Sequence, residues 1–247
     1  MKTAMEIVRA SRDPGRYKAK DYIDYLCKPF VEMHGDRAYS DDDTIIGGIG
    51  KLGPYSVMVI GQRKDKNYGM PNPEGYRKVL RLIAHANKFK LPVITIIDTP
   101  GAGCGIGAEE RGQALTIAQC IYEFSRLEVP TLSVIIGEGG SGGALALSLT
   151  DEIWMLENSV YSILSPEGFA SILWKDPSKK DEAAELMRLT SHNLMEDGFI
   201  ERIIEEDGGE IYNLKNHIIN FLEKSYSISI DKIMKKRYDK YRKIIGS

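Results

Sequence analysis

Apolar and polar positions follow two different periods in the first part of the chain. Two extended apolar runs, residues 44–49 and 55–60, flank the sequence Lys-Leu-Gly-Pro at residues 51–54. A turn signal between two strand-like runs predicts a β-hairpin. The period then changes to that of a helix face, with apolar side chains at i, i+3, i+4 and i+7. These side chains are Tyr76, Val79, Leu80 and Ile83.

Short apolar runs rich in β-branched residues predict the strands of a buried sheet. They cover residues 91–97, 132–136, 152–156 and 159–164. A loop and a helix follow each of the first two runs, and the second loop is the glycine segment, residues 137–143, which precedes a short helix at 144–147. This order of elements predicts an α/β fold with a mostly parallel sheet and right-handed crossovers.

The two ends of the chain have helical patterns. A weak helical pattern precedes the acidic run at residues 41–43, so we expect a helical lead-in over residues 1–40 and the main domain over residues 41–247. The apolar positions of this pattern are Tyr22, Ile23, Tyr25, Leu26, Phe30, Val31 and Met33. Helices are also predicted for the polar last third, at residues 181–190, 213–224 and 232–243.

Composition and charge exclude several classes of protein. The chain has 247 residues, and its 33 Lys and Arg against 35 Asp and Glu leave a formal charge of −2, which argues against binding nucleic acid by bulk electrostatics. No apolar run reaches the roughly 18–20 residues of a membrane span, and the first residues lack the apolar core of a signal peptide. We therefore expect a cytoplasmic protein with no membrane contact.

Cysteine usage argues against a metal site in this chain. Its three cysteines, Cys27, Cys104 and Cys120, are scattered and include no Cys-x-x-Cys pair. A structural zinc site needs about four closely spaced ligands, and a disulfide framework needs an even number of cysteines. We therefore expect neither in this chain.

The glycine segment matches two short motifs. Gly137, Gly139 and Gly142 fit the dinucleotide fingerprint GxGxxG, but only about eight residues separate the segment from the next strand, too few for a full crossover helix. Gly139, Ser141 and Gly143 also fit the nucleophile-elbow pattern GxSxG. A serine hydrolase using Ser141 would need a histidine, and both downstream histidines, 192 and 217, lie in polar sequence.

A third interpretation of the glycine segment uses its backbone. Consecutive glycines at a helix N-terminus present N–H groups that no side chain covers, next to the positive end of the helix dipole. Such donors form an oxyanion hole, and one of them contributes about 3 kcal/mol to transition-state stabilisation in a known site. Gly101, Ala102 and Gly103, after the preceding strand, would border the same crevice. The plainer alternative is that these glycines only form turns.

Longer motifs carry a resemblance to a known family. The sequence resembles the carboxyltransferase alpha subunit of bacterial acetyl-CoA carboxylase from about residue 34 to residue 204. The motifs are GMPNPEGYRK at 69–78, IDTPGA at 97–102, GIGAEERGQ at 105–113, GEGGSGGALA at 137–146 and YSILSPEGFASILWK at 161–175.

The resemblance implies a fold and a reaction. The fold is crotonase-like (ClpP/crotonase), built of ββα units with helical N- and C-terminal segments. The reaction is carboxyl transfer from carboxybiotin, on the biotin carboxyl carrier protein, to acetyl-CoA, which gives malonyl-CoA for fatty acid biosynthesis. Negative charge develops on an oxygen of each reactant, so the family uses two oxyanion holes, one in each of its alpha and beta subunits.

The resemblance also implies site residues and partners. The alpha-subunit hole corresponds to the N–H groups of Gly139 and Gly140. Substrate-binding positions would be Gly101, Ala102, Gly103, Ser165, Pro166, Glu167 and Gly168. The expected partners are a beta subunit with a four-cysteine zinc ribbon, the carrier protein and biotin carboxylase, around an assembly of two alpha and two beta chains.

One departure from the family pattern keeps alternatives open. Gly103 and Cys104 stand where the family has Tyr-Pro, in the wall expected to face biotin. A paralogue that uses another acyl-CoA therefore remains possible, as does a regulatory subunit that binds the partner without catalysis. Cys104 itself is either a space-filling residue or a reactive thiol.

Overall fold

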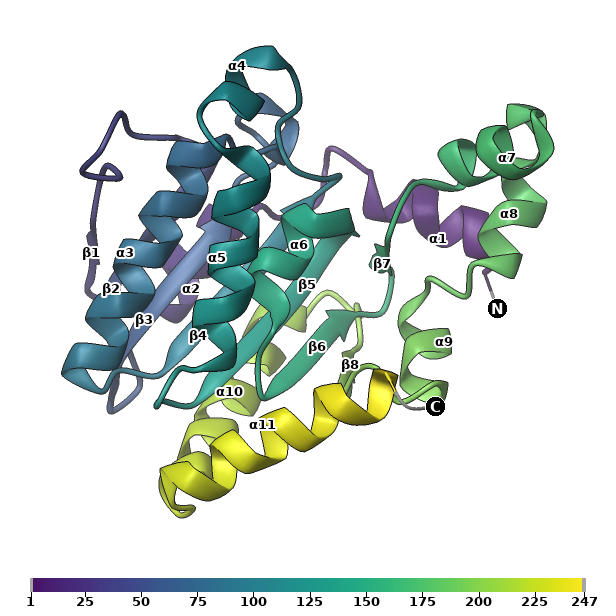
Figure 1. The fold of residues 1–247 in the computed structure, drawn as a ribbon. Coiled ribbons are helices and arrows are strands. Elements are labelled where there is room, and N and C mark those ends of the chain that lie inside the picture. The colour runs from purple at the N-terminus through teal and green to yellow at the C-terminus, as the bar shows by residue number, and fades with distance from the viewer. Residues whose placement is uncertain (1, 246–247) are drawn as a thin grey trace.

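A single mixed sheet forms the centre of the chain. The computed structural model describes residues 2–245, and within them the strand order is β1-β2-β3-β4-β5-β6-β8, with β7 paired to β5 (Figure 1). The strands are β1 Phe30–Glu32, β2 Ile45–Leu52, β3 Tyr55–Gln62, β4 Val93–Thr99, β5 Thr131–Gly140, β6 Glu152–Leu156, β7 Val160–Ser162 and β8 Arg202–Ile204.

The direction of the strands divides the sheet in two. β1, β2 and β3 pair antiparallel, and Leu52 opposite Tyr55 closes the predicted hairpin. From β3 through β4, β5 and β6 to β8, every pairing is parallel. The prediction of a mostly parallel sheet is therefore confirmed, and the carboxyl ends of β4 and β5 meet at one edge.

Helices cover both faces of this sheet. The helices are α1 Ala4–Ser11, α2 Ala19–Leu26, α3 Pro73–Phe89, α4 Ile106–Glu110, α5 Gln113–Ser125, α6 Ser141–Ser148, α7 Pro166–Trp174, α8 Lys180–Leu186, α9 Ser191–Glu196, α10 Glu210–Tyr226 and α11 Ile230–Ile245. α3, α5 and α6 lie on one face, and α2 and α10 lie on the other (Figure 1).

Alternating strand residues supply the two cores. In β4, Ile94 and Ile96 belong to the core under α2 and α10, whereas Val93 and Ile97 belong to the core under α3, α5 and α6. Side chains that alternate across a strand produce this division, and a strand buried on both faces reads as a continuous apolar run. No helix within residues 2–245 is long and apolar enough to cross a membrane.

The lead-in differs from the sequence prediction at its end. Its helical pattern continues to α2 as expected, but Phe30 and Val31 lie in strand β1, and Met33 follows that strand. Pro29 precedes them, and proline can neither donate the helical N–H nor tolerate a helical residue before it. The division of the chain at residue 40 stays a prediction, although β1 pairs with β2 across it.

A separate group of helices stands beyond the end of β5. α1 packs on α8, and together with Val160 and Leu189 they bury a small apolar cluster that contains Ala4, Met5 and Val8. β7 and the chain around it join this group to the sheet (Figure 1). The carboxyl end of β5 therefore lies between its neighbouring strands and this α1–α8 unit.

The basic C-terminal helix is anchored by a buried side chain. Arg237 of α11 is 2% exposed, and its Nε donates to Asp151 Oδ1 at 2.7 Å. Its Nη1 and Nη2 also donate to carbonyl oxygens in the last turn of α5 and just after it, those of Phe124, Leu127 and Val129. These carbonyls end a helix and the turn after it, so one guanidinium satisfies acceptors that would otherwise be unpaired.

Candidate functional site

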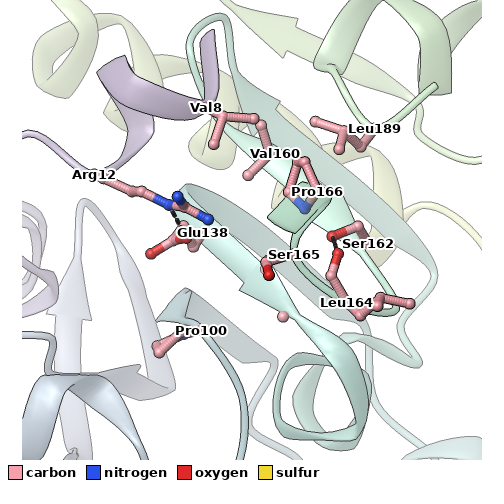
Figure 2. A pocket seen from close by; sticks show the side chains of 12 residues that line it. Val8, Arg12, Pro100, Glu138, Val160, Ser162, Leu164, Ser165, Pro166 and Leu189 are labelled. Atoms are coloured by element: carbon pink, nitrogen blue, oxygen red, sulfur yellow. Dashed lines mark hydrogen bonds and ion pairs between the residues drawn. The ribbon is translucent and has the colours of Figure 1, made fainter. Parts of the chain in front are cut away.

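A cavity lies at the carboxyl end of β5, between the sheet and the α1–α8 unit (Figure 2). It is lined by Val8, Arg12, Pro100, Glu138, Gly139, Gly140, Val160, Ser162, Leu164, Ser165, Pro166 and Leu189. Four of the residues expected from the sequence are in this lining: Gly139, Gly140, Ser165 and Pro166. The structure thus brings together residues more than 20 positions apart in the chain.

The backbone of the glycine segment differs from the sequence prediction. Residues 137–140 complete strand β5 instead of forming a loop, and α6 begins at Ser141. Gly139 stands opposite Thr99 of β4 and Tyr161 of β7. Gly140 is the N-cap residue of α6, with no side-chain cap, so the helix N-terminus opens directly at the end of the strand.

Two glycines of the segment are required by close backbone contacts. A Cβ on Gly140 would lie 2.1 Å from the carbonyl oxygen of Pro100, and a Cβ on Gly143 would lie 2.6 Å from the nitrogen of Ala102. No side chain fits at these distances. The strand-to-helix junction is therefore pressed against the chain that follows β4, beyond what turn formation alone would require.

The loop over residues 101–103, after β4, packs against the glycine segment and does not line the cavity. Gly101, Ala102 and Gly103 are absent from the cavity lining. Gly103 donates its N–H to the carbonyl oxygen of Pro71 at 2.8 Å, and Gln113 Nε2 donates to the carbonyl oxygens of both Gly103 and Pro71. Because these polar groups are occupied within the chain, the loop forms a fixed backing for the glycine segment.

The start of α7 forms the opposite wall. Ser165 caps this helix, since its Oγ accepts the N–H of Gly168 at 3.1 Å, and Pro166 is the first helical residue. Ser165 and Pro166 line the cavity, whereas Glu167 and Gly168 are outside the lining. Glu167 is nevertheless tied to it through Arg12, whose Nη1 donates to Glu167 Oε1 at 2.9 Å.

Charged residues that the sequence analysis missed complete the cavity. Arg12 Nε donates to Glu138 Oε1 at 2.7 Å, and Lys64 Nζ holds Glu138 Oε2 (Figure 2 shows Arg12 and Glu138). Burial raises the pKa of Glu138, but the charges and hydrogen bonds of Lys64 and Arg12 outweigh it, and the pKa falls below its ordinary value. Nothing local in the sequence signals a pair 126 positions apart.

A buried carboxylate lies below this group. Asp98, at the end of β4, is 4% exposed, and its Oδ1 accepts the N–H of Glu138 at 3.0 Å. Burial raises the pKa of Asp98, and Lys64, 3.4 Å away, only partly opposes the rise. The peptide between Gly137 and Glu138 is therefore held from the β4 side as well.

The serine and histidines do not form a catalytic group. Ser141 is exposed and has φ 52°, the strained conformation typical of a nucleophile elbow. His192 lines a different surface hollow, together with Glu157 and Glu205, and His217 lies against Trp154 and Arg202. Among residues 2–245, no hydrogen bond joins Ser141 to a histidine.

Cysteines and acidic residues offer no metal site in the part of the chain that is described. Among residues 2–245, no group of three or more His, Cys, Asp or Glu side chains could hold a metal ion. Cys27 and Cys120 are buried and Cys104 is exposed. Cys104 therefore lies outside the buried core, and its role stays a prediction.

The fold and the cavity define the class of protein. The architecture matches that of transcarboxylase 12S, solved with methylmalonyl-coenzyme A and methylmalonic acid bound, with a TM-score of 0.77 and 17% identity over 88% of this chain and 42% of that one. The chain therefore has the crotonase-like fold that the family resemblance implies.

The sequence comparisons narrow the class to one family. The model of the acetyl co-enzyme A carboxylase carboxyltransferase-like family matches residues 2–245, and the chain belongs to this family. The acetyl-coenzyme A carboxylase carboxyl transferase subunit alpha of Clostridium botulinum is 50% identical over 97% of this chain and 93% of its own length. A protein of Natranaerobius thermophilus named for subunits beta/alpha is 49% identical over 98% of this chain and 43% of its own length.

Proposed function

We propose that this chain is the carboxyltransferase alpha subunit of a biotin-dependent acetyl-CoA carboxylase. It transfers the carboxyl group of carboxybiotin, carried on a biotin carboxyl carrier protein, to acetyl-CoA and forms malonyl-CoA. Family membership and the names of relatives about 50% identical over almost the full length support this assignment. The observation that carries it is the position of Gly139 and Gly140 in the cavity lining, at the junction of β5 and α6.

The junction suits a reaction in which charge develops on an oxygen. Gly139 and Gly140 have no side chain to cover their N–H groups, and the N-terminus of α6 directs its positive end to the same place. Backbone donors fixed in this way stabilise an enolate oxygen without reorganising during the reaction. Carboxybiotin supplies the carboxyl group as a co-substrate. This chain then contributes binding and charge stabilisation, with no protein base.

The cavity is too small to act alone. It encloses about 60 Å³, whereas small-molecule sites usually measure about 300–1,000 Å³. Apolar side chains of α7, whose first residue lines the cavity, and of the segment before it are exposed: Ile163 is 76% exposed, Ile172 71% and Leu173 59%. A second chain seated on these side chains would deepen the cavity and bury them.

The beta subunit is the partner that we propose for this surface. The Natranaerobius relative carries both beta and alpha in its name and spans more than twice the length of this chain, which supports a site shared between the two. An assembly of two alpha and two beta chains, together with the carrier protein and biotin carboxylase, completes the proposed enzyme. This chain then supplies one of the two oxyanion holes, and turnover depends on the beta subunit for the other.

Two variants test the proposed chemistry in the complex with the beta subunit. Carboxyl transfer from malonyl-CoA to free biotin should persist in Ser141→Ala, because that change leaves every N–H in place. It should fall about 100-fold in Gly139→Ala, because the new Cβ would lie 2.9 Å from the Tyr161 ring and displace the donor. If Gly139→Ala kept its activity and Ser141→Ala lost thioester hydrolysis, the result would favour a hydrolase that uses the strained Ser141.

A further inference from the structure

Arg12 links helix α1 to the end of strand β5 through charged hydrogen bonds beside the cavity. It ends helix α1 as the C-cap residue, and its side chain is 34% exposed. Near Arg12, the α1–α8 unit packs through Val8, Val160 and Leu189, which also line the cavity. Figure 2 shows the Arg12 side chain extending from α1 toward Glu138 on β5.

The guanidinium of Arg12 reaches both walls of the cavity. Its Nε donates to Glu138 Oε1 at 2.7 Å, and its Nη1 donates to Glu167 Oε1 at 2.9 Å. Glu138 directly precedes Gly139, and Glu167 directly follows Pro166. A planar fork with fixed donor directions sets the distance and the angle between two carboxylates, which a lysine cannot do.

Contacts hold both carboxylate oxygens of Glu138 and its backbone N–H. Lys64 Nζ holds the second carboxylate oxygen, and the backbone N–H of Glu138 donates to Asp98 Oδ1 at 3.0 Å. Burial lowers the pKa of Arg12, but its hydrogen bonds to Glu167 and Glu138 outweigh this and raise the pKa above its ordinary value. Arg12 therefore stays charged at neutral pH. Arg12 and Lys64 lie between carboxylates that would otherwise repel one another.

We propose that Arg12 is a positioning residue for carboxyl transfer. By fixing Glu138 against Glu167 it holds the Gly139 peptide at a set distance from the wall formed by Ser165 and Pro166. Displacement of a donor by about 1 Å costs on the order of 100-fold in rate, so a link next to the glycine pair affects turnover without touching substrate. This inference rests on the proposed function. It adds that Arg12, in the helical lead-in over residues 1–40, contributes to the rate of carboxyl transfer.

The test compares variants of two arginines on α1. Arg9 is the matched control, because its contact with Asp181 is 3.7 Å long and both side chains are more than 60% exposed. Each variant is assembled with the beta subunit, and kcat and KM for carboxyl transfer from malonyl-CoA to free biotin are measured per assembled complex, below the melting temperature. We expect Arg12→Gln to lower kcat about 10- to 100-fold with a smaller change in KM, and Arg9→Gln to leave both unchanged.

Two further variants distinguish positioning from folding. Arg12→Lys keeps the charge but reaches one carboxylate at a time, so kcat should lie between those of the wild type and Arg12→Gln. Adding Glu167→Gln to Arg12→Gln should cost little more than Arg12→Gln alone, because the two residues act through one contact. A purely structural role would lower the yield of complex and the melting temperature while kcat per complex stayed constant.

The outcomes separate this inference from the proposed function. If the wild-type complex transfers carboxyl groups and Arg12→Gln does so equally well per complex, the positioning role is wrong and the proposed function stands. If the wild-type complex binds the beta subunit but transfers no carboxyl group, the proposed function fails, and the positioning role fails with it.

Discussion

Gly140 lies so close to Pro100 that a Cβ added to it would come within 2.1 Å of the Pro100 carbonyl oxygen. Replacing Gly140 with alanine should therefore destabilise the chain by more than about 3 kcal/mol, because backbone would have to move. Gly142, two residues on, is the matched control, since a Cβ there meets only the Ile117 side chain at 3.6 Å. Gly142→Ala should be neutral or stabilising by up to about 1 kcal/mol.

Urea unfolding of the two variants measures this difference. Equal stability of Gly140→Ala and Gly142→Ala would contradict the close contact between the glycine segment and the chain after β4. Because Gly140→Ala should disturb the fold, a loss of activity in this variant would not show that the Gly140 N–H binds an oxyanion. Gly139, whose nearest neighbour is the Tyr161 side chain, is the better position for testing the oxyanion hole.

The exposed apolar side chains of α7 should contribute to binding the beta subunit. Ile172→Asp places a charge on a 71%-exposed apolar residue of α7 and should weaken the complex at least tenfold, as is typical of a central interface residue. Phe89→Asp is the control, since Phe89 is 58% exposed but ends α3, shortly before the amino end of β4. Titration calorimetry with the beta subunit gives both affinities, and equal affinities would exclude α7 from the interface.

Acid should weaken the contact between Arg12 and Glu138. Burial raises the pKa of Glu138, but Lys64 and Arg12 lower it by more than burial raises it. In the folded chain, the Glu138 carboxylate therefore stays ionised at pH values below its ordinary pKa of 4.5. As the pH falls below about 4.5, the unfolded chain takes up the proton first, and this part of the stability is lost. Arg12→Gln should be less stable by about 1–3 kcal/mol at pH 7, with a difference that shrinks toward pH 3.

Unfolding free energies at several pH values test this sign. A difference between the wild type and Arg12→Gln that stays constant from pH 7 to pH 3 would show that the contact does not depend on an ionised Glu138. Arg9→Gln again serves as the control, because its exposed contact should contribute less than about 1 kcal/mol at any pH.

The anchor of α11 should be among the most costly side chains to remove. Arg237→Leu removes the guanidinium that pairs with Asp151 and that donates to carbonyl oxygens at the end of α5, and breaking such a buried pair typically costs about 3–5 kcal/mol. Lys235→Ala, on the same helix, removes only an exposed pair with Asp239 and should cost less than about 0.5 kcal/mol. A small loss of unfolding free energy in Arg237→Leu would mean that α11 is held mainly by its apolar contacts.

Periodicity was sufficient for most of the fold. The runs at 91–97 and 152–156 became β4 and β6, and the helix face from Tyr76 to Ile83 became part of α3, because each pattern reports burial by the sheet directly. The sequence predicts a loop for residues 137–140, since glycine is rare in strands. They complete β5 because β4 and β7 flank them closely, a constraint that local sequence does not contain.

The site was predictable only where one segment carries it. Gly139 and Gly140 are recognisable from their own motif, and Ser165 and Pro166 from another. The contact of Arg12 with Glu138 and Glu167 joins three segments, and the residues lie 126 and 155 positions apart. Only the packing of α1 on the end of the sheet brings them together.

Reconstitution with the beta-type subunit from the same source tests the central proposal most directly. The chain is co-purified with that subunit, and carboxyl transfer from malonyl-CoA to free biotin is measured for each chain and for the pair. We expect a stable complex that turns over malonyl-CoA, and no turnover by either chain alone. Turnover by this chain alone, or a stable complex without any transfer, would contradict a carboxyltransferase site shared between the two subunits.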